Sequence, residues 1–373
     1  MADLQTLFNQ FHEIAETPAV QFKKFLDAGE KVVGCAPGYT PEEVIHAMGF
    51  VPFGVWGAYM QVEDAKAYFP AFIPSLLQTM LELGIKGKYD GMTAIVIPSL
   101  SDSLKALGEN WKYAVKNVPF IPAVYPQNRA IPCGREFTKA AYKRIEKRLN
   151  ELTGAVLTDE KLAASIEIYN AHNAAMRDFA AACAKYDCLT PCRRRDVFKS
   201  AWFMRKEDHT KLVRALLDEL VNQPVEHKKL RIITSGIIVD NNNLLQILED
   251  NNINIVADDV LHESRQYRVD ATEGSTAIEK LVDKFARMDY CSLLYDKDKK
   301  RGPMLVDLAQ KTKAGGVIVF LTKFSDPEEF DYVPLRRALQ AAGIPVLLIE
   351  IDSQMDRFDQ AQTAIETFVD LLS

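Results

Sequence analysis

The chain has 373 residues, of which 48% are hydrophobic and 26% are charged, as in ordinary soluble globular proteins. At roughly 150 residues per domain, this length predicts two or three domains. The formal net charge of −6 argues against a nucleic-acid partner, because phosphate recognition needs a basic face. No apolar run reaches the ~18 residues that a membrane span needs. The first residues also lack the pattern of a signal peptide, so we expect a cytoplasmic protein without a membrane partner.

The first third of the chain predicts a helix followed by a strand–helix–strand unit. Residues 4–28 favour one helix, and residues 31–35 and 51–55 favour strands. Between these strands, Thr40 can cap a helix and Glu43 completes a capping box.

The second half of the chain repeats this plan. Residues 230–234 and 253–256 predict strands, and residues 243–250 predict the helix between them. Two such units, each followed downstream by another apolar strand, indicate a duplicated, doubly wound α/β architecture.

A helical segment separates the two units. An apolar stripe at helical spacing follows a predicted cap at Thr158, and residues 199–221 also have helical composition. Residues 223–225 form a plausible linker, and an amphipathic helix closes the chain.

Two apolar strands end in the same way. Strand 95–97 runs into Ser101-Asp102, strand 317–321 runs into Ser325-Asp326, and a helix-like stretch follows in both cases. Ligand sites in open α/β sheets lie at the carboxyl ends of strands, where loops meet helix N-termini. The matching endings therefore suggest two related halves whose sites face each other.

Other polar groups leave alternatives open. Asp258-Asp259 and Glu263-Ser264-Arg265 follow the predicted strand 253–256, where they either contact a ligand or pair with each other to fix a loop. The chain has no G-x-G-x-x-G, no P-loop and no H-E-x-x-H motif, so no nucleotide or zinc site is indicated.

The cysteines are too sparse for a disulfide scaffold, but three of them are close in sequence. Cys183, Cys188 and Cys192 form C-x4-C-x3-C just before three arginines, a spacing from which an iron–sulfur cluster could be built. A fourth ligand is missing, and Cys183 lies on the apolar helical stripe. We therefore favour a structural role for these thiols.

Four stretches together resemble the β subunits of the 2-hydroxyacyl-CoA dehydratases, the family that includes benzoyl-CoA reductase subunits. They are residues 34–57 (GCAPGYTPEEVIHAMGFVPFGVWG), 102–112, 257–270 (ADDVLHESRQYRVD) and 323–332 (KFSDPEEFDY). The resemblance covers nearly the whole chain and is strongest for lactyl-CoA and 2-hydroxyglutaryl-CoA dehydratases.

This resemblance implies an α/β fold of two Rossmann-like, doubly wound parallel-sheet domains, at residues 1–150 and 226–373, joined by a helical region at 151–225. It also implies a dehydratase α subunit as partner. In the family the heterodimer removes water from an (R)-2-hydroxyacyl-CoA bound at the subunit interface, giving an enoyl-CoA. An ATP-dependent iron–sulfur activator injects one electron, and the thioester becomes a ketyl radical. Lactyl-CoA is our preferred substrate.

The sequence departs from the family at the cluster cysteines. By the resemblance, the three cysteines that hold a cluster in the β subunit fall on Pro74, Ser101 and Ser325. Iron in such clusters is held by thiolates, which neither proline nor serine supplies. We therefore predict a degenerate cluster pocket and no cofactor on this chain, with a [4Fe–4S] cluster in the partner α subunit. The presence of a flavin stays open.

The vacated positions have two interpretations. Ser101 and Ser325 either cap the helices that follow, which we favour, or bind each other, a water or a ligand. Asp102, Asp326, Glu263 and Arg265 are expected to line the cavity, without an assigned catalytic role, and the catalytic centre is expected in the α subunit. The alternatives are a non-redox assembly or binding subunit, and a cluster rebuilt on Cys183, Cys188 and Cys192.

Overall fold

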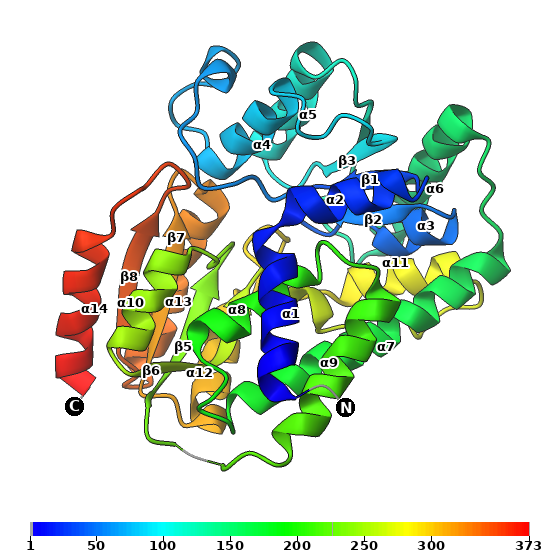
Figure 1. Ribbon diagram of the computed structural model, residues 1–373. Coiled ribbons are helices and arrows are strands. Elements are labelled where there is room, and N and C mark those ends of the chain that lie inside the picture. Colours follow the sequence, from blue (N-terminus) through cyan, green and yellow to red (C-terminus); the bar gives the residue numbers. More distant parts are fainter. Residues whose placement is uncertain (1–2, 226, 373) are drawn as a thin grey trace.

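Two four-stranded sheets form the framework of the protein, which the computed structural model describes for residues 3–225 and 227–372 (Figure 1). The first sheet contains β1 (Val32–Cys35), β2 (Val51–Gly54), β3 (Ala94–Pro98) and β4 (Phe120–Ala123). The second contains β5 (Leu230–Gly236), β6 (Ile253–Val260), β7 (Gly316–Thr322) and β8 (Val346–Ile351).

The two sheets have the same topology. Their strand orders are β2-β1-β3-β4 and β6-β5-β7-β8, and every strand pair is parallel. Every residue of β1, β3 and β7 is buried, as expected for parallel strands with helices on both faces. This confirms the predicted duplicated, doubly wound α/β architecture.

The N-terminal part contains five α-helices and one 3₁₀ helix within the described residues. They are α1 (Leu4–Glu16), α2 (Pro18–Asp27), α3 (Glu42–Ala47), η1 (Asp64–Ala67), α4 (Ser75–Ile85) and α5 (Asp102–Ala114). The prediction of one helix over 4–28 was wrong, because Thr17 leaves the helical conformation (ψ 51°) ahead of Pro18. A residue before proline is disfavoured in the helical region, so the chain starts a second helix there.

The predicted capping box at the start of α3 was also wrong. The Thr40 hydroxyl donates to the carbonyl of Ala36 (3.0 Å) instead of capping, and Pro41 occupies the N-cap position. The Glu43 carboxylate turns away to Lys284.

Four helices connect the sheets: α6 (Pro132–Thr153), α7 (Asp159–Cys183), α8 (Pro191–Ser200) and α9 (Lys206–Leu220). Thr158 caps α7 as predicted, because its side chain accepts a hydrogen bond from the amide of Lys161. The expected helix over 199–221 is interrupted after Ser200 by a turn that places Trp202 in the core. The Trp202 carbonyl accepts a hydrogen bond from the amide of Gly54 (2.8 Å), which joins the turn to β2.

The C-terminal part contains five α-helices and one 3₁₀ helix within the described residues. They are α10 (Asn242–Asp250), the 3₁₀ helix η2 (Ser264–Tyr267), α11 (Ala277–Arg287), α12 (Arg301–Thr312), α13 (Asp326–Ala341) and α14 (Asp359–Leu372). Strand β6 is longer than predicted. Asp258 and Asp259 therefore lie inside the strand, opposite Thr234 and Ser235 of β5, and not in the loop after it.

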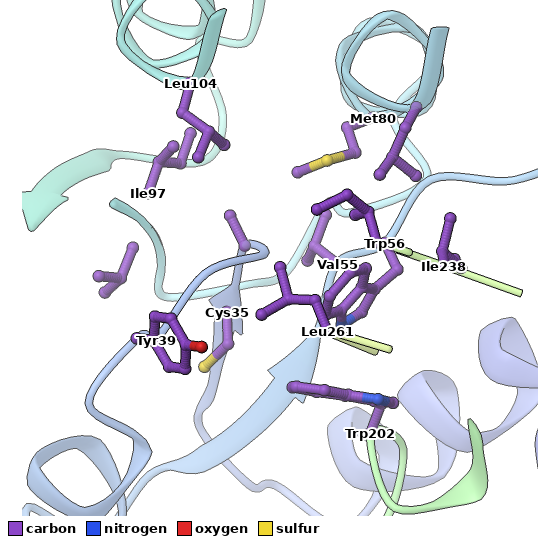
Figure 2. Packing of buried hydrophobic residues seen from close by; sticks show 14 of the residues in the cluster. Cys35, Tyr39, Val55, Trp56, Met80, Ile97, Leu104, Trp202, Ile238 and Leu261 are labelled. Carbon is purple, nitrogen blue, oxygen red and sulfur yellow. The ribbon is translucent and has the colours of Figure 1, made fainter. Parts of the chain in front are cut away.

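One hydrophobic core spans both halves of the chain. Its buried members include Val33 of β1, Ile232 of β5 and Phe320 of β7. Trp56, Trp202 and Leu261, which come from three distant segments, lie together in this core (Figure 2). No helix in the described part of the chain is long and apolar enough to cross a membrane.

Candidate functional site: a pocket between the two sheets

The site begins at the topological switch point of each sheet. In the first sheet, β2 and β3 lie on opposite sides of β1, and in the second, β6 and β7 lie on opposite sides of β5. A crevice forms outside the carboxyl ends of the strands at such a point, and ligands of open α/β proteins bind there.

The structure brings both switch points to one small pocket. It has a volume of about 40 Å³, enough for water but far too small for an acyl-CoA. Its wall includes Pro37 after β1 and Ile237 after β5, and also Pro74, Ser101 and Ser325. The three positions that the family resemblance aligned with cluster cysteines therefore lie around one space.

Each of these three residues precedes a helix. Pro74 is the N-cap of α4, Ser101 of α5 and Ser325 of α13, so three helix N-termini converge on the pocket. The Ser101 hydroxyl accepts a hydrogen bond from the amide of Leu104 (3.2 Å) and caps α5. The Ser325 side chain accepts no such cap bond within the described part of the chain.

The donors around the pocket do not fit an iron–sulfur cluster. The wall carries serine hydroxyls and the buried Thr322 hydroxyl, which has no hydrogen-bond partner, and none of the described lining residues is a cysteine. A hydroxyl must lose a proton of very high pKa to act as a ligand, whereas these clusters are held by thiolates.

The four expected cavity-lining residues are not in this wall. Asp102 and Asp326 are exposed side chains in the first turns of α5 and α13, and Asp102 pairs with Lys105 (3.0 Å). Acidic side chains in the first turn stabilise a helix by interacting with its dipole, and this explains the Ser-Asp pattern without a ligand. Glu263 and Arg265 are buried in a different place, beneath the carboxyl end of β6.

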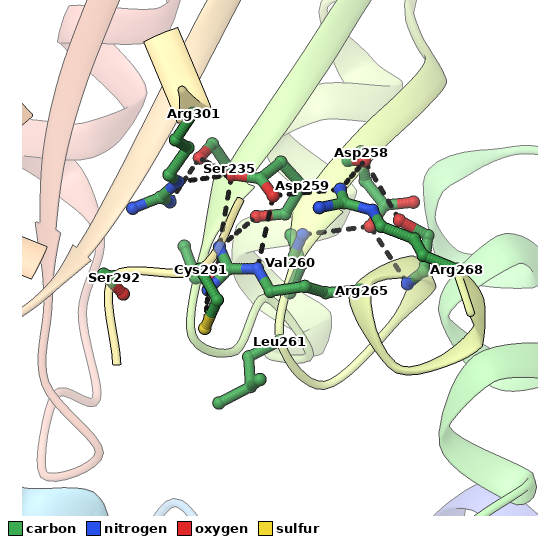
Figure 3. Close-up of polar contacts among 12 residues, drawn as sticks. Ser235, Asp258, Asp259, Val260, Leu261, Arg265, Arg268, Cys291, Ser292 and Arg301 are labelled. Carbon is green, nitrogen blue, oxygen red and sulfur yellow. Dashed lines mark hydrogen bonds and ion pairs between the residues drawn. The ribbon is translucent and has the colours of Figure 1, made fainter. Parts of the chain in front are cut away.

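Arg265 belongs to a buried ion-pair network centred on Asp259 (Figure 3). Asp259 accepts hydrogen bonds from Arg265 (3.2 Å), Arg268 (2.9 Å) and Arg301 (2.6 Å). Burial alone would raise the pKa of the Asp259 carboxyl, but these three guanidinium groups hold it well below its usual value. Asp259 is therefore a fixed negative charge.

A second buried group lies beside the first. Arg194 of α8 bridges the carboxylates of Asp258 and Glu263. Burial raises the pKa of Glu263 to about 7, and Asp258 adds to the effect while Arg194 opposes it. Residues 258–265 were expected either to contact a ligand or to pair with each other and fix a loop. Their hydrogen bonds and ion pairs correspond to the second alternative.

The partners of these acids were missed in the sequence. Arg194 was visible only as part of the arginine run after the cysteines, and nothing in the sequence marks Arg301 as a partner of Asp259, 42 residues away. An acidic pair directly after an apolar run was the one available signal, since charges that become buried need partners.

The three clustered cysteines do not form a ligand set. Among the residues that the structure describes, the single group of three candidate ligand atoms within 4.8 Å of one another is His12, Glu16 and Asp196. Burial raises the pKa of Cys183 to about 12, and the pKa of Cys192 to a similar value with a contribution from Glu249. Both shifts disfavour the thiolate that a metal ligand requires.

Aromatic rings fill the space beside the pocket. Trp56, just after β2, lies 4.9 Å from Trp202 and 4.7 Å from His262 between ring centroids, and the indole of Trp202 donates to the carbonyl of His262 (3.0 Å). All three residues are buried, so the junction between the two sheets is packed at this point.

The fold and the site define a class: a duplicated α/β protein whose two switch points face one another across the junction of its halves. Residues 37–372 match the family described as 2-hydroxyglutaryl-CoA dehydratase, D-component, and the chain belongs to this family.

Three relatives that match over their full length are named as β subunits. The chain is 46% identical to the (R)-phenyllactyl-CoA dehydratase β subunit of Clostridium sporogenes, with all of both chains covered. It is 34% identical to the lactoyl-CoA dehydratase β subunit of Anaerotignum propionicum, again over all of both chains. It is also 34% identical to the (R)-2-hydroxyglutaryl-CoA dehydratase β subunit of Acidaminococcus fermentans, over 99% of this chain and all of the relative. These findings confirm the family resemblance.

Proposed function

We propose that this chain is the β subunit of a heterodimeric (R)-2-hydroxyacyl-CoA dehydratase, which removes water from its substrate to give an enoyl-CoA. The observation that carries the proposal is the 46% identity to a phenyllactyl-CoA dehydratase β subunit over the full length of both chains. An α subunit is the partner. The cytoplasmic location expected from the sequence is part of the same proposal.

The catalytic centre is assigned to the α subunit. Three observations support this assignment: the pocket of about 40 Å³ is too small for an acyl-CoA, its wall carries hydroxyls where thiolates would be needed, and Trp56 packs the adjacent junction. The β subunit then completes the assembly and carries no cluster of its own. An ATP-dependent iron–sulfur activator supplies the electron, as the family resemblance implies.

The substrate is proposed to carry an aryl side chain. The identity of 46% to a phenyllactyl-CoA relative, against 34% to a lactoyl-CoA relative, favours this choice over the lactyl-CoA expected from the sequence.

Reconstitution tests the proposal. The chain is coproduced anaerobically with a dehydratase α subunit and supplied with activator, ATP and reductant, and enoyl-CoA formation is followed from (R)-phenyllactyl-CoA and lactyl-CoA. We expect ATP-dependent turnover, faster with the aryl substrate. A stable complex that stays inactive with every substrate and activator would favour the alternative, a non-redox assembly or binding subunit.

Iron and sulfide analysis with electron paramagnetic resonance tests the cluster assignment separately. We expect the iron of the α subunit alone in the heterodimer and none in the isolated β chain. Four irons on the β chain would overturn the cluster-free assignment, whatever the activity.

A further inference from the structure

A second cavity lies beside residues 39–41, in the loop between β1 and α3. It has a volume of about 60 Å³, and its lining residues include some from the start of α3, from α7, from the start of α9 and from α11. The N-terminal part, the connecting helices and the C-terminal part therefore all contribute to it. Its polar lining includes Glu42, Glu43, Tyr169, His172, Lys206 and Lys284. It is separate from the pocket around Ser101 and Ser325, because none of the described residues lines both.

Two ion pairs face this cavity. Glu42 pairs with Lys206 (3.1 Å) and Glu43 with Lys284 (2.6 Å), and none of the four side chains is more than 12% exposed. Each pair cancels its own charge, so the wall holds two carboxylates and two ammonium groups with no net charge. Burying four ionised side chains costs free energy, and such side chains are normally found at the surface instead.

The cavity wall also carries a polar atom without a partner. Nε2 of His172 contacts Nδ1 of His209 (3.0 Å), but Nδ1 of His172 is buried and makes no hydrogen bond with any residue that the structure describes. A buried polar atom without a partner costs about 1–3 kcal/mol unless a water or a ligand satisfies it. The remaining wall is aromatic, with Tyr142, Tyr267 and Phe285 among its rings.

These features restrict the ligand. A ligand with a net charge would add an uncompensated charge to a wall whose buried positive and negative charges already balance. A small molecule with one carboxylate and one ammonium group keeps the cavity neutral and reaches charges of both signs on the wall. We propose that this cavity binds the zwitterion of a small amino acid, with its carboxylate toward Lys206 and Lys284 and its ammonium toward Glu42 and Glu43.

The volume sets the size of that amino acid. A cavity of about 60 Å³ holds a few water-sized groups and is well below the ~150 Å³ that accommodates a benzene ring. Glycine, with five non-hydrogen atoms, fits this limit, whereas L-alanine already has as many non-hydrogen atoms as benzene. Because the ligand would join α3, α7 and α11, its binding would tie the N-terminal sheet to the rest of the chain.

Calorimetric titration of the full-length chain with glycine tests the proposal. We expect glycine to bind with one-to-one stoichiometry and a Kd below ~10 mM. Methylamine lacks the carboxylate and acetate lacks the ammonium, and neither is larger than glycine, so each should bind at least about tenfold more weakly than glycine. Absence of glycine binding, or equally tight binding of methylamine or acetate, would overturn the proposal.

Variants locate the site. Lys284→Met and Glu43→Gln should each weaken the bound amino acid at least about tenfold, because each removes one charge that faces the cavity. Lys311→Met is the matched control, because Lys311 forms an exposed pair with Asp307 and neither residue lines the cavity. Circular dichroism checks the folding of each variant. The titrations of the unchanged protein with glycine, methylamine and acetate still test the proposal if a variant does not fold. Unchanged binding by both folded cavity variants would place the amino acid elsewhere.

Discussion

Nε of Arg301, at the start of α12, lies 2.6 Å from a carboxylate oxygen of Asp259, the penultimate residue of β6. Both side chains are at most 3% exposed. This contact ties the helix that precedes β7 to the strand at the far side of the sheet. It also positions the loop after β6, because Asp259 at the same time accepts hydrogen bonds from Arg265 and Arg268.

Asp259→Asn should therefore lower the free energy of unfolding by about 3–5 kcal/mol, since it leaves buried guanidinium groups without their main counter-charge. Asp307→Asn is the control, because its partner Lys311 is exposed and surface pairs contribute about 0–1 kcal/mol. Urea unfolding at neutral pH measures both. Equal losses in the two variants would show that the network adds little to stability.

Glu263 is expected to destabilise the folded chain at neutral and alkaline pH. Its folded pKa of about 7 lies above the ~4.3 of an unperturbed glutamate, so the folded chain binds the extra proton between these values. Stability from this group is then present at low pH and is lost as the pH rises from about 4.3 to about 7.

Glu263→Gln should remove this loss, leaving a protein at pH 8 that is at least as stable as the unchanged chain. Asp258→Asn, which removes the other carboxylate beside Arg194, has no such compensation and should destabilise the fold by about 3 kcal/mol. Unfolding curves at pH 5 and pH 8 distinguish the two. A strong destabilisation by Glu263→Gln at pH 8 would contradict the expectation.

Most of the sheet framework could be predicted from the sequence. Strands of a parallel sheet are buried on both faces and therefore form continuous apolar runs, as 317–321 does within β7. Helix starts were less predictable, because a cap residue has competing partners. Thr158 caps its helix, whereas the Thr40 hydroxyl bonds to a carbonyl four residues before it.

The polar interior could not be predicted in the same way. Ion pairs such as Arg301 with Asp259 depend on which segments the tertiary fold brings together, and no periodicity in the sequence marks them. The matching strand endings predicted that Ser101 and Ser325 would face each other, whereas Pro74 was expected beside them only through the family resemblance. The ligand-sized cavity beside Lys284 had no sequence signal, because its charged residues come from segments more than 200 residues apart.

Ser101 and Ser325 should differ in their effect on stability although they occupy matching positions. Ser101→Ala removes the hydrogen bond from Leu104 and should cost about 1 kcal/mol, the usual value of a lost N-cap. Ser325→Ala removes no cap bond and should cost clearly less. Chemical unfolding of both variants, with dehydratase activity of the heterodimer as a second measurement, checks this expectation. A loss of turnover in folded Ser325→Ala would instead indicate a ligand-binding role.

The buried histidine His209 should make the chain sensitive to acid. Burial, with the charge of Lys206 beside it, lowers its folded pKa to about 3, against ~6.5 for an unperturbed histidine. Between these values only the unfolded chain binds the proton, so stability falls as the pH drops below about 6.5, by about 2 kcal/mol at pH 5 from this group alone. His209→Gln should flatten the dependence by close to one proton, whereas His12→Gln, at a side chain that is 59% exposed, serves as the control. Unfolding free energies at pH 7, 6 and 5 measure the slope, and an unchanged slope in a folded His209→Gln variant would contradict this origin of the acid sensitivity.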